Sequence, residues 1–248
     1  MMATAGRRDA QVKRLVVGIS GATGIIYGIR LLETLHAAPG IETHLVLSAA
    51  AKRTMVEETS WTVQQVETLA TRSYPDRDIG AAIASGSFST CGMVIAPCSI
   101  KTLAAVATGY TESLLARAAD VTLKEGRCLI ALVRETPLHR GHLEAMLALA
   151  QAGGIVWPPL PDFSRRPRSV AAVIDETVGH VLRRLGFSDD VPPQWEEVKA
   201  RTGRNAGQGA ETAPAGARQR PASEASTGAR LAIATAAPGA GGQRSGPP

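Results

Sequence analysis

Small, hydroxyl and charged residues stand directly after several apolar runs of this 248-residue chain. The first group is Gly18-Ile19-Ser20-Gly21-Ala22-Thr23-Gly24, which follows Leu15-Val16-Val17 and precedes a segment with helical periodicity. Glycines let the backbone turn sharply and approach a ligand, and the unpaired N–H groups of a helix start suit a phosphate. We therefore predict a phosphate-binding turn, to which Ser20 and Thr23 add hydroxyl donors. The glycine spacing differs from the dinucleotide fingerprint, so a plain strand-to-helix turn is the alternative.

Later groups after apolar runs add side chains suited to phosphate chemistry. They are Ser48, residues 97–102 and the pair Arg134-Glu135. Arg side chains make charge-assisted hydrogen bonds to phosphate, and a nearby carboxylic acid can donate a proton to a leaving group. Arg117 and Lys124 are also of suitable types, although helices often carry such residues as solvated charges. Adjacent Arg134 and Glu135 could equally form a simple salt bridge.

Strands and helices must alternate to position these groups. The apolar runs predict strands at 14–18, 42–48, 92–96, 128–133 and 154–157, and residues 73–80 have the composition of a loop. Helical periodicity predicts helices at 25–37, 49–58, 62–69, 100–107, 114–124, 142–151 and 170–185. Strands without polar alternation are buried on both faces, so the pattern favours an α/β fold with an open, doubly wound, mostly parallel sheet. Ligands of such sheets bind outside the carboxyl ends of the strands.

Composition restricts the class of protein and its domains. We predict a flexible arm over residues 1–13, one domain over 14–200, and a disordered tail over 201–248 that is rich in Ala, Gly, Pro and Arg. The tail holds six Arg and two Glu, so it carries +4 of the net charge of +5, and the basic balance does not indicate a nucleic-acid site in the domain. Three cysteines in or beside apolar runs suggest neither disulfides nor a zinc site. The sequence has no signal peptide pattern and no membrane-spanning run, so we expect a cytoplasmic protein.

Five short motifs in order resemble the UbiX-type flavin prenyltransferases, and the similarity runs from about Lys13 to Trp195. They are residues 18–24, Ser85-Gly86-Ser87-Phe88, Pro97-Cys98-Ser99-Ile100-Lys101-Thr102, Arg117-Ala118-Ala119-Asp120 with Lys124-Glu125, and Arg134-Glu135-Thr136-Pro137-Leu138-His139. The resemblance implies a Rossmann-like or flavodoxin-like three-layer sandwich and a homo-oligomer, a dodecamer. It also implies a reaction without metal, in which a dimethylallyl group passes from dimethylallyl phosphate to reduced FMN. Bonds form at flavin N5 and C6, and the product, prenyl-FMN, is the cofactor of UbiD-type decarboxylases.

The resemblance assigns expected roles residue by residue. The expected FMN-binding residues are Gly21, Ala22, Thr23, Ser48, Ser99, Ile100, Lys101, Thr102 and Arg134. The expected catalytic residues around the prenyl phosphate are Glu58, Arg117, Lys124 and Glu135, the last as proton donor. Ser164, His180 and Trp195 occupy the expected positions for binding the prenyl substrate.

Two of these positions depart from the family. Ser164 stands where members have a phosphate-binding Tyr, and His180 stands where they have a phosphate-binding Arg. Either His180 or one of Arg165, Arg166 and Arg168 could supply the missing charge. A non-catalytic FMN or prenyl-FMN binding protein that assists a decarboxylase is therefore the alternative function. A cysteine-decarboxylating flavoprotein is a third, but its Pro-x-Met-Asn-type segment is absent.

Overall fold

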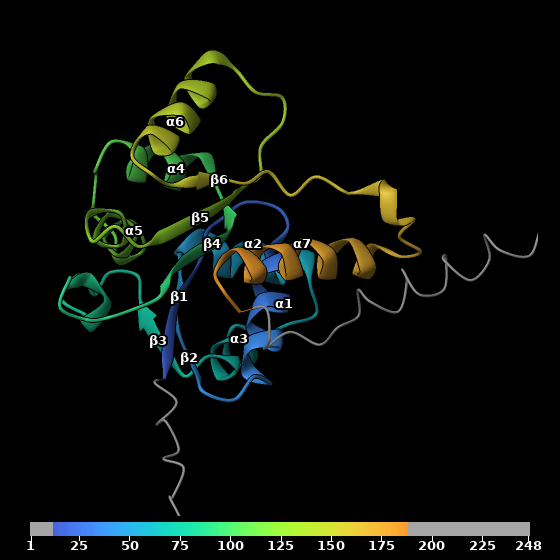
Figure 1. The fold of residues 1–248 in the computed structure, drawn as a ribbon, viewed down its shortest axis with the longest axis horizontal. Coiled ribbons are helices and arrows are strands. Elements are labelled where there is room, and N and C mark those ends of the chain that lie inside the picture. The colour runs from blue at the N-terminus through green and yellow to red at the C-terminus, as the bar shows by residue number, and fades with distance from the viewer. Residues whose placement is uncertain (1–11, 188–248) are drawn as a thin grey trace, which may run out of the picture. The chain divides into compact units, whose positions relative to one another are not determined.

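A single parallel β-sheet with helices on both faces forms the part of the chain that the computed structural model describes, residues 12–187 (Figure 1). The sheet order is β3-β2-β1-β4-β5-β6, and every neighbouring pair is parallel. The strands are β1 (Lys13–Ile19), β2 (Ile41–Leu47), β3 (Arg72–Pro75), β4 (Gly92–Cys98), β5 (Cys128–Val133) and β6 (Ile155–Val156). The helices are α1 (Ile25–His36), α2 (Ala49–Glu58), α3 (Val63–Leu69), α4 (Ile100–Ala107), α5 (Leu114–Lys124), α6 (Arg140–Gln151) and α7 (Val170–Arg184), with short 3₁₀ turns η1 (Ala82–Ala84) and η2 (Phe163–Arg165).

Two apolar cores hold the three layers together. Along β1, Leu15 and Val17 pack into the core beneath α1, α2, α3 and α7, whereas Val16 packs into the core beneath α4, α5 and α6. Successive strand residues point to opposite faces, so a strand with no polar alternation serves both cores at once. The doubly wound α/β fold expected from the sequence is confirmed, and the predicted "mostly parallel" sheet is parallel throughout.

The strand order reverses between β1 and β4, and this reversal places the loops after these strands side by side. From β1 the chain adds β2 and β3 on one side of β1. It then crosses to the other side of β1 and adds β4, β5 and β6. Ligands of doubly wound sheets bind at such a switch point, outside the carboxyl ends of the strands. Gly28 of α1 makes this region compact, because a side chain there would overlap the carbonyl oxygen of Ala96 in β4.

The prediction of a loop over residues 73–80 is wrong at its start. Residues Arg72–Pro75 form β3, which pairs with β2 at the edge of the sheet. Only Tyr74 of this strand is half-buried. Edge strands are short and polar, so β3 has no apolar run that sequence inspection could detect.

The predicted tail, and Trp195 with it, lie outside the described residues, as does most of the predicted N-terminal arm. Within residues 12–187, no helix combines the length and the apolar character needed to cross a membrane.

Candidate active site

Ser20 joins the loops that follow β1 and β4. Its hydroxyl group donates to the carbonyl oxygen of Pro97 (3.0 Å) and accepts from the N–H of Ser99 (2.7 Å). The side chain is only 1% exposed. The expectation that Ser20 donates to a ligand is therefore wrong, because its one hydroxyl proton is used inside the protein. Ser20 instead fixes the two loops relative to each other.

The start of α1 receives the carboxylate of Glu58. Gly24 caps this helix in the left-handed conformation (φ 94°), which glycine adopts without strain. The N–H groups of Gly24 and Ile25 donate to Oε2 of Glu58, at 2.8 and 3.2 Å. Glu58 is the last residue of α2, so tertiary folding brings it to the glycine-rich turn. Thr23, expected to add a hydroxyl donor for a ligand, is exposed beside this turn.

The glycine-rich turn also packs against the first turn of α2. A Cβ at Gly21 would overlap the side chain of Ala50, so only glycine fits there. Ser48 caps α2, since its Oγ accepts from the N–H of Ala51 at 3.1 Å. The structure therefore gathers four expected site residues, Gly21, Thr23, Ser48 and Glu58, at the carboxyl ends of β1 and β2, with Ala22 between the first two.

The start of α4 presents donors that suit an anion. Oγ of Ser99 accepts from the N–H of Thr102 (3.3 Å) and contacts Oγ1 of Thr102 (3.2 Å). In the described part of the chain, no acceptor binds the N–H groups of Ile100 and Lys101. Unpaired N–H groups at a helix start, together with the positive end of the helix dipole, suit a phosphate. These four residues were all expected to bind FMN.

Arg134 and Glu135 complete the carboxyl edge of the sheet. The backbone N–H of Arg134 donates to the carbonyl oxygen of Cys98 (3.2 Å), so the loop after β5 lies beside the loop after β4. Burial raises the pKa of Tyr27, whereas a hydrogen bond with Thr177 and the positive charge of Arg134 lower it. The charge of Arg134 therefore acts on Tyr27 of α1. Glu135 is exposed, and its carboxylate accepts from the N–H of Thr136 (3.1 Å).

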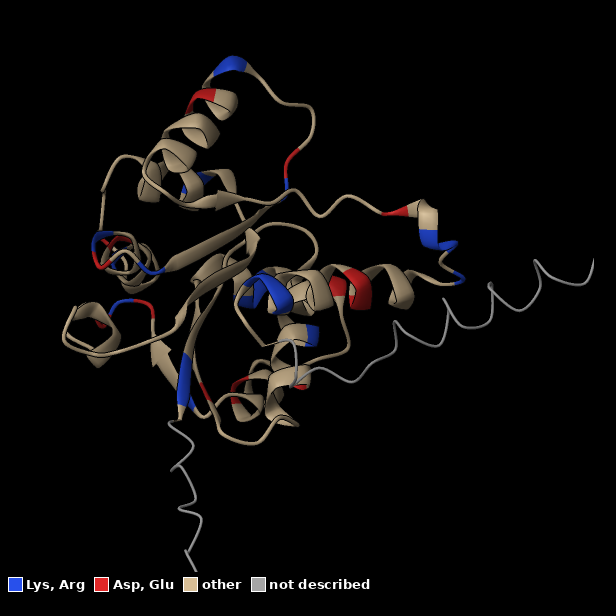
Figure 2. Ribbon diagram, in the orientation of Figure 1, with Lys and Arg blue, Asp and Glu red and all other residues tan. Residues whose placement is uncertain are grey.

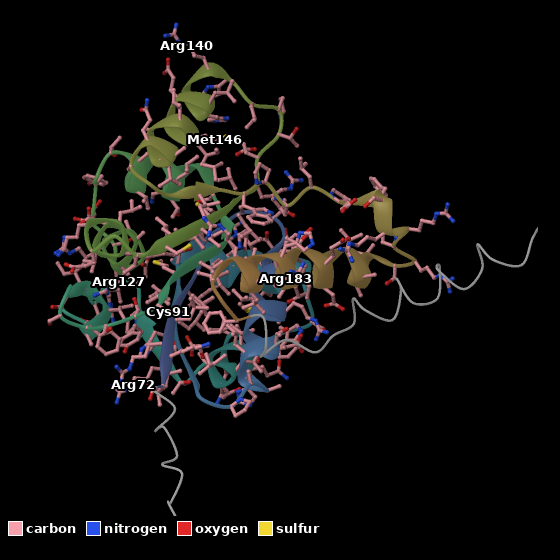
Figure 3. The ribbon with its side chains drawn as sticks, in the orientation of Figure 1. Arg72, Cys91, Arg127, Arg140, Met146 and Arg183 are labelled. Atoms are coloured by element: carbon pink, nitrogen blue, oxygen red, sulfur yellow. The ribbon has the colours of Figure 1, made fainter. Side chains whose placement is uncertain are left out.

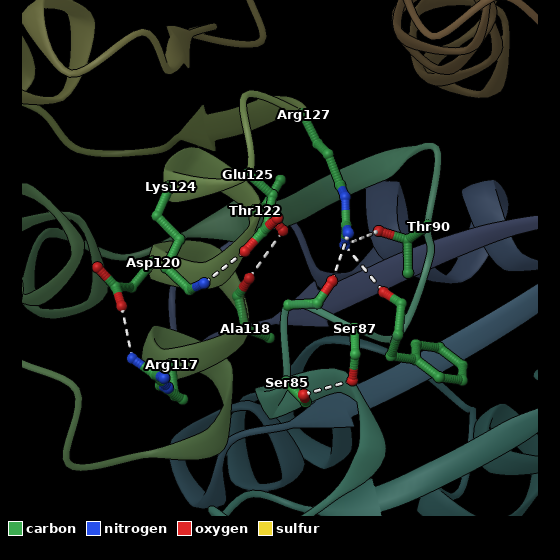
Figure 4. Close-up of polar contacts among 12 residues, drawn as sticks. Ser85, Ser87, Thr90, Arg117, Ala118, Asp120, Thr122, Lys124, Glu125 and Arg127 are labelled. Carbon is green, nitrogen blue, oxygen red and sulfur yellow. Dashed lines mark hydrogen bonds and ion pairs between the residues drawn. The ribbon is translucent and has the colours of Figure 1, made fainter.

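Arg117 and Lys124 lie in a separate group with the loop that precedes β4 (Figure 4). Arg117 pairs with Asp120 (2.8 Å), and Lys124 pairs with Glu125, lowering the pKa of that carboxylate. A Cβ at Gly86 would overlap the Glu125 carboxylate, so the loop approaches the end of α5 closely. The small residues of the turn at residues 85–88 therefore allow this loop to pack against the charged end of α5.

The length of β5 separates the two groups within one chain. Lys124 precedes this strand and Glu135 follows it. Six residues of parallel strand span about 20 Å. Arg117 lies seven residues before Lys124 on α5, which is about two helical turns and the same helix face. The apolar residues of α5 face the core, so this charged stripe points away from the sheet.

The last expected residues lie along α7 and the connection that precedes it. Ser164 is exposed in η2, and its N–H donates to Asp162 (2.9 Å). His180 makes an edge-to-face contact with Trp157, with ring centroids 6.4 Å apart. Burial is the main cause that lowers the pKa of His180, and the charges of Arg183 and Arg165 act in the same direction. A histidine in this setting is neutral at neutral pH.

Sequence inspection missed two residues near these positions. Tyr27 lies among the apolar residues of α1, and Glu176 lies on the apolar face of α7. Glu176 is only 6% exposed. An acidic residue within an apolar helical stripe is the signal that could have identified it, because buried carboxylates need a partner.

Comparisons with known proteins agree on one family. The family model described as "Flavoprotein" matches residues 3–182. A relative from Escherichia coli K12, named flavin prenyltransferase UbiX, is 51% identical over 187 residues, which are 75% of this chain and 99% of the relative. The crystal structure of a dodecameric FMN-dependent Ubix-like decarboxylase from Escherichia coli O157:H7 is 46% identical with a TM-score of 0.69, covering 70% of this chain and 94% of that one. The crystal structure of AnUbiX (PadA1) with FMN and dimethylallyl pyrophosphate is 40% identical with a TM-score of 0.70, covering 73% and 96%.

Proposed function

This chain belongs to the Flavoprotein family and, within it, to the UbiX-type flavin prenyltransferases, and from that premise we propose that it transfers a dimethylallyl group from dimethylallyl phosphate to reduced FMN. The product is prenyl-FMN, with new bonds at N5 and C6, for use by a UbiD-type decarboxylase. The observation that carries the proposal is the convergence of the α4 start, with its unpaired N–H groups, and the Arg134-Glu135 pair at one edge of the sheet. A cytoplasmic location stays a prediction.

The start of α4 is the proposed position of the FMN phosphate. The N–H groups of Ile100 and Lys101 and the hydroxyl group of Thr102 supply donors, whereas the Ser99 hydroxyl group already donates to Oγ1 of Thr102. The start of α1 fits a phosphate less well, because Glu58 already accepts from its first two N–H groups. The turn from Gly21 to Thr23 then borders the flavin. When bound, reduced FMN supplies the nucleophile that receives the alkyl group.

Arg134 and Glu135 are proposed to act on the allylic phosphate. In the transfer, the C–O bond between the dimethylallyl group and the phosphate breaks, and the phosphate leaves with the electron pair. The guanidinium group of Arg134 stabilises the negative charge that the leaving phosphate gains. Glu135 is exposed at the same edge and donates a proton to a phosphate oxygen.

Arg117 and Lys124 are proposed to reach the site from a neighbouring subunit. About 20 Å of β5 separates Lys124 from Glu135 within one chain. The charged stripe of α5 faces outward, where a second copy of the chain can meet it. A homo-oligomer is consistent with the dodecameric crystal structure of the similar Escherichia coli protein. The proposed site therefore lies between subunits.

The test is an anaerobic incubation of the purified protein with reduced FMN and dimethylallyl phosphate, followed by mass analysis of the released flavin. A mass gain of one prenyl unit is the expected result, and dimethylallyl diphosphate in a parallel reaction identifies the preferred donor. Glu135→Gln should slow the reaction by about 100-fold or more if Glu135 donates the proton. Glu144→Gln is the matched control, because Glu144 is exposed on α6 and pairs only with Arg140 in the described residues. Bound but unmodified FMN with both donors would refute the transferase and favour the non-catalytic FMN binder.

A further inference from the structure

One face of α7 gathers polar side chains that meet three other elements. Glu176, Thr177 and His180 lie within about one turn of each other on this face. Thr177 contacts Tyr27 of α1, on which the positive charge of Arg134 also acts. His180 contacts Trp157, which directly follows β6. This face of α7, called the α7 wall below, therefore borders the carboxyl ends of β5 and β6.

Arg165 joins the α7 wall from the connection that precedes the helix. Its Nε lies 3.1 Å from Oε1 of Glu176. The two side chains differ in exposure: 36% for Arg165 and 8% for Glu176. Figure 2 shows acidic and basic segments close together where this connection meets α7. The ion pair therefore links an exposed segment to the interior of the helix layer.

Burial makes Glu176 dependent on a cation. Removal from water is the main cause that raises the pKa of this carboxyl group, and Asp162 raises it further. The positive charges of Arg165 and of Arg183, which Figure 3 labels on the last turn of α7, lower it. A buried carboxylate with no cation costs several kcal/mol in general, so Glu176 holds the Arg165 side chain in place.

Arg165 is the best candidate for the cationic group of this wall. His180 is neutral at neutral pH, as its burial and the two neighbouring arginines require. Arg165 carries a permanent positive charge beside Glu176, and a guanidinium group is the side chain best suited to recognise a phosphate. Ser164, next to it in η2, interacts with the Asp162 carboxylate through its N–H group and its side chain, which lowers the pKa of Asp162.

We propose that Arg165 binds the anionic group of the alkyl donor and that buried Glu176 positions it. The inference rests on the proposed transferase function and extends it, since it names a determinant of donor recognition at the α7 wall. Arg165 acts on binding of the donor, whereas Glu135 acts on bond cleavage. The two residues should therefore affect different kinetic constants.

The test compares Arg165→Gln and Arg165→Lys with the unchanged protein in the prenylation assay. We expect Arg165→Gln to raise KM for dimethylallyl phosphate about 10-fold or more, with FMN affinity unchanged and kcat altered less than KM. Arg165→Lys should recover part of the loss, because it keeps the charge but not the planar fork. Arg140→Gln is the control, since Arg140 is an exposed arginine of α6 that is assigned no role in the site. Equal KM values for Arg165→Gln and the unchanged protein would overturn the proposal.

The role of Glu176 is tested by a double-mutant cycle with Glu176→Gln. If Glu176 acts only through Arg165, Glu176→Gln should raise KM for the donor when Arg165 is present. The same substitution should leave KM unaltered in a protein that already carries Arg165→Gln. Additive effects would overturn the positioning role.

A parallel measurement separates failure of the inference from failure of the proposed function. Inorganic phosphate is titrated into the FMN-loaded protein, and its affinity is measured by calorimetry. Weaker phosphate binding by Arg165→Gln supports the anion site even if no donor reacts. Identical phosphate affinities refute the anion site whether or not the unchanged protein turns over.

Discussion

Mixed oligomers provide the sharpest test of a site that is shared between subunits. Lys124 and Glu135 stand at opposite ends of β5, about 20 Å apart. Fully extended lysine and glutamate side chains together cover about 10 Å. One chain therefore cannot place both side chains on the same phosphate group. If both residues are required, each active site takes them from two different copies.

This arrangement predicts a specific recovery of activity. Lys124→Ala and Glu135→Gln should each reduce turnover by about 100-fold or more when alone. Co-expression of the two variants in equal amounts produces random mixed oligomers, in which about one interface in four pairs an intact Lys124 with an intact Glu135. Turnover of the mixture should therefore return to about a quarter of that of the unchanged protein.

A second mixture makes the result decisive. A chain that carries both Lys124→Ala and Glu135→Gln is co-expressed with the unchanged protein in equal amounts. This mixture should give about a quarter of full activity if sites are shared between subunits. It should give about a half if each chain holds a complete site. Prenyl-FMN formation per bound FMN is measured for each mixture, with differently tagged chains to verify mixing. No recovery in the first mixture, together with half activity in the second, would refute the shared site. Full activity of Lys124→Ala alone would refute its catalytic role.

Two further predictions concern the scaffold. Gly28→Ala gains about 1 kcal/mol of helix propensity, but its Cβ would overlap the Ala96 carbonyl oxygen and lie 2.7 Å from Cδ1 of Ile19, so overpacking by about 1–3 kcal/mol should dominate. Urea unfolding should show a net loss of stability and weaker FMN retention, and an unchanged midpoint would contradict the close approach of α1 to β4. His44 is 3% exposed, and burial lowers its pKa. Below about pH 6.5 the unfolded chain therefore binds more protons than the folded chain, so the free energy of unfolding falls as the pH decreases. His44→Phe should flatten that decline in thermal unfolding between about pH 6.5 and 5, and an unaltered decline would show that other groups cause it.

Local sequence patterns were sufficient for the fold and for naming the sheet edge at which we expect the ligand. Within residues 12–187, five of the six strands and all seven helices were predicted with ends at most two residues from those observed, because apolar runs and helical periodicity are properties of neighbouring residues. Residues after β1, β2, β4 and β5 were identified as site candidates because parallel strands end at a common edge. The edge strand β3 was missed because its pairing with β2 is a long-range contact that leaves no apolar run.

Which candidates share one site was decided by the tertiary structure. In sequence, Lys124 and Glu135 are eleven residues apart and look like partners, yet the intervening strand separates them by its full length. Glu58 and Gly24 are far apart in sequence, yet a hydrogen bond of 2.8 Å joins them. Proximity in a doubly wound sheet depends on strand order and on the direction of each chain crossing, which no single segment encodes.

The sequence by itself determined the family, the parallel α/β sheet and the set of side chains available for phosphate chemistry. Tertiary structure alone decided that Ser20 is consumed inside the protein, that Glu58 occupies the start of α1, and that Arg165 meets a buried Glu176. The physical reason is that residue types set which interactions are available. Burial and long-range contacts then decide which of those interactions are made and which groups are left to bind a ligand.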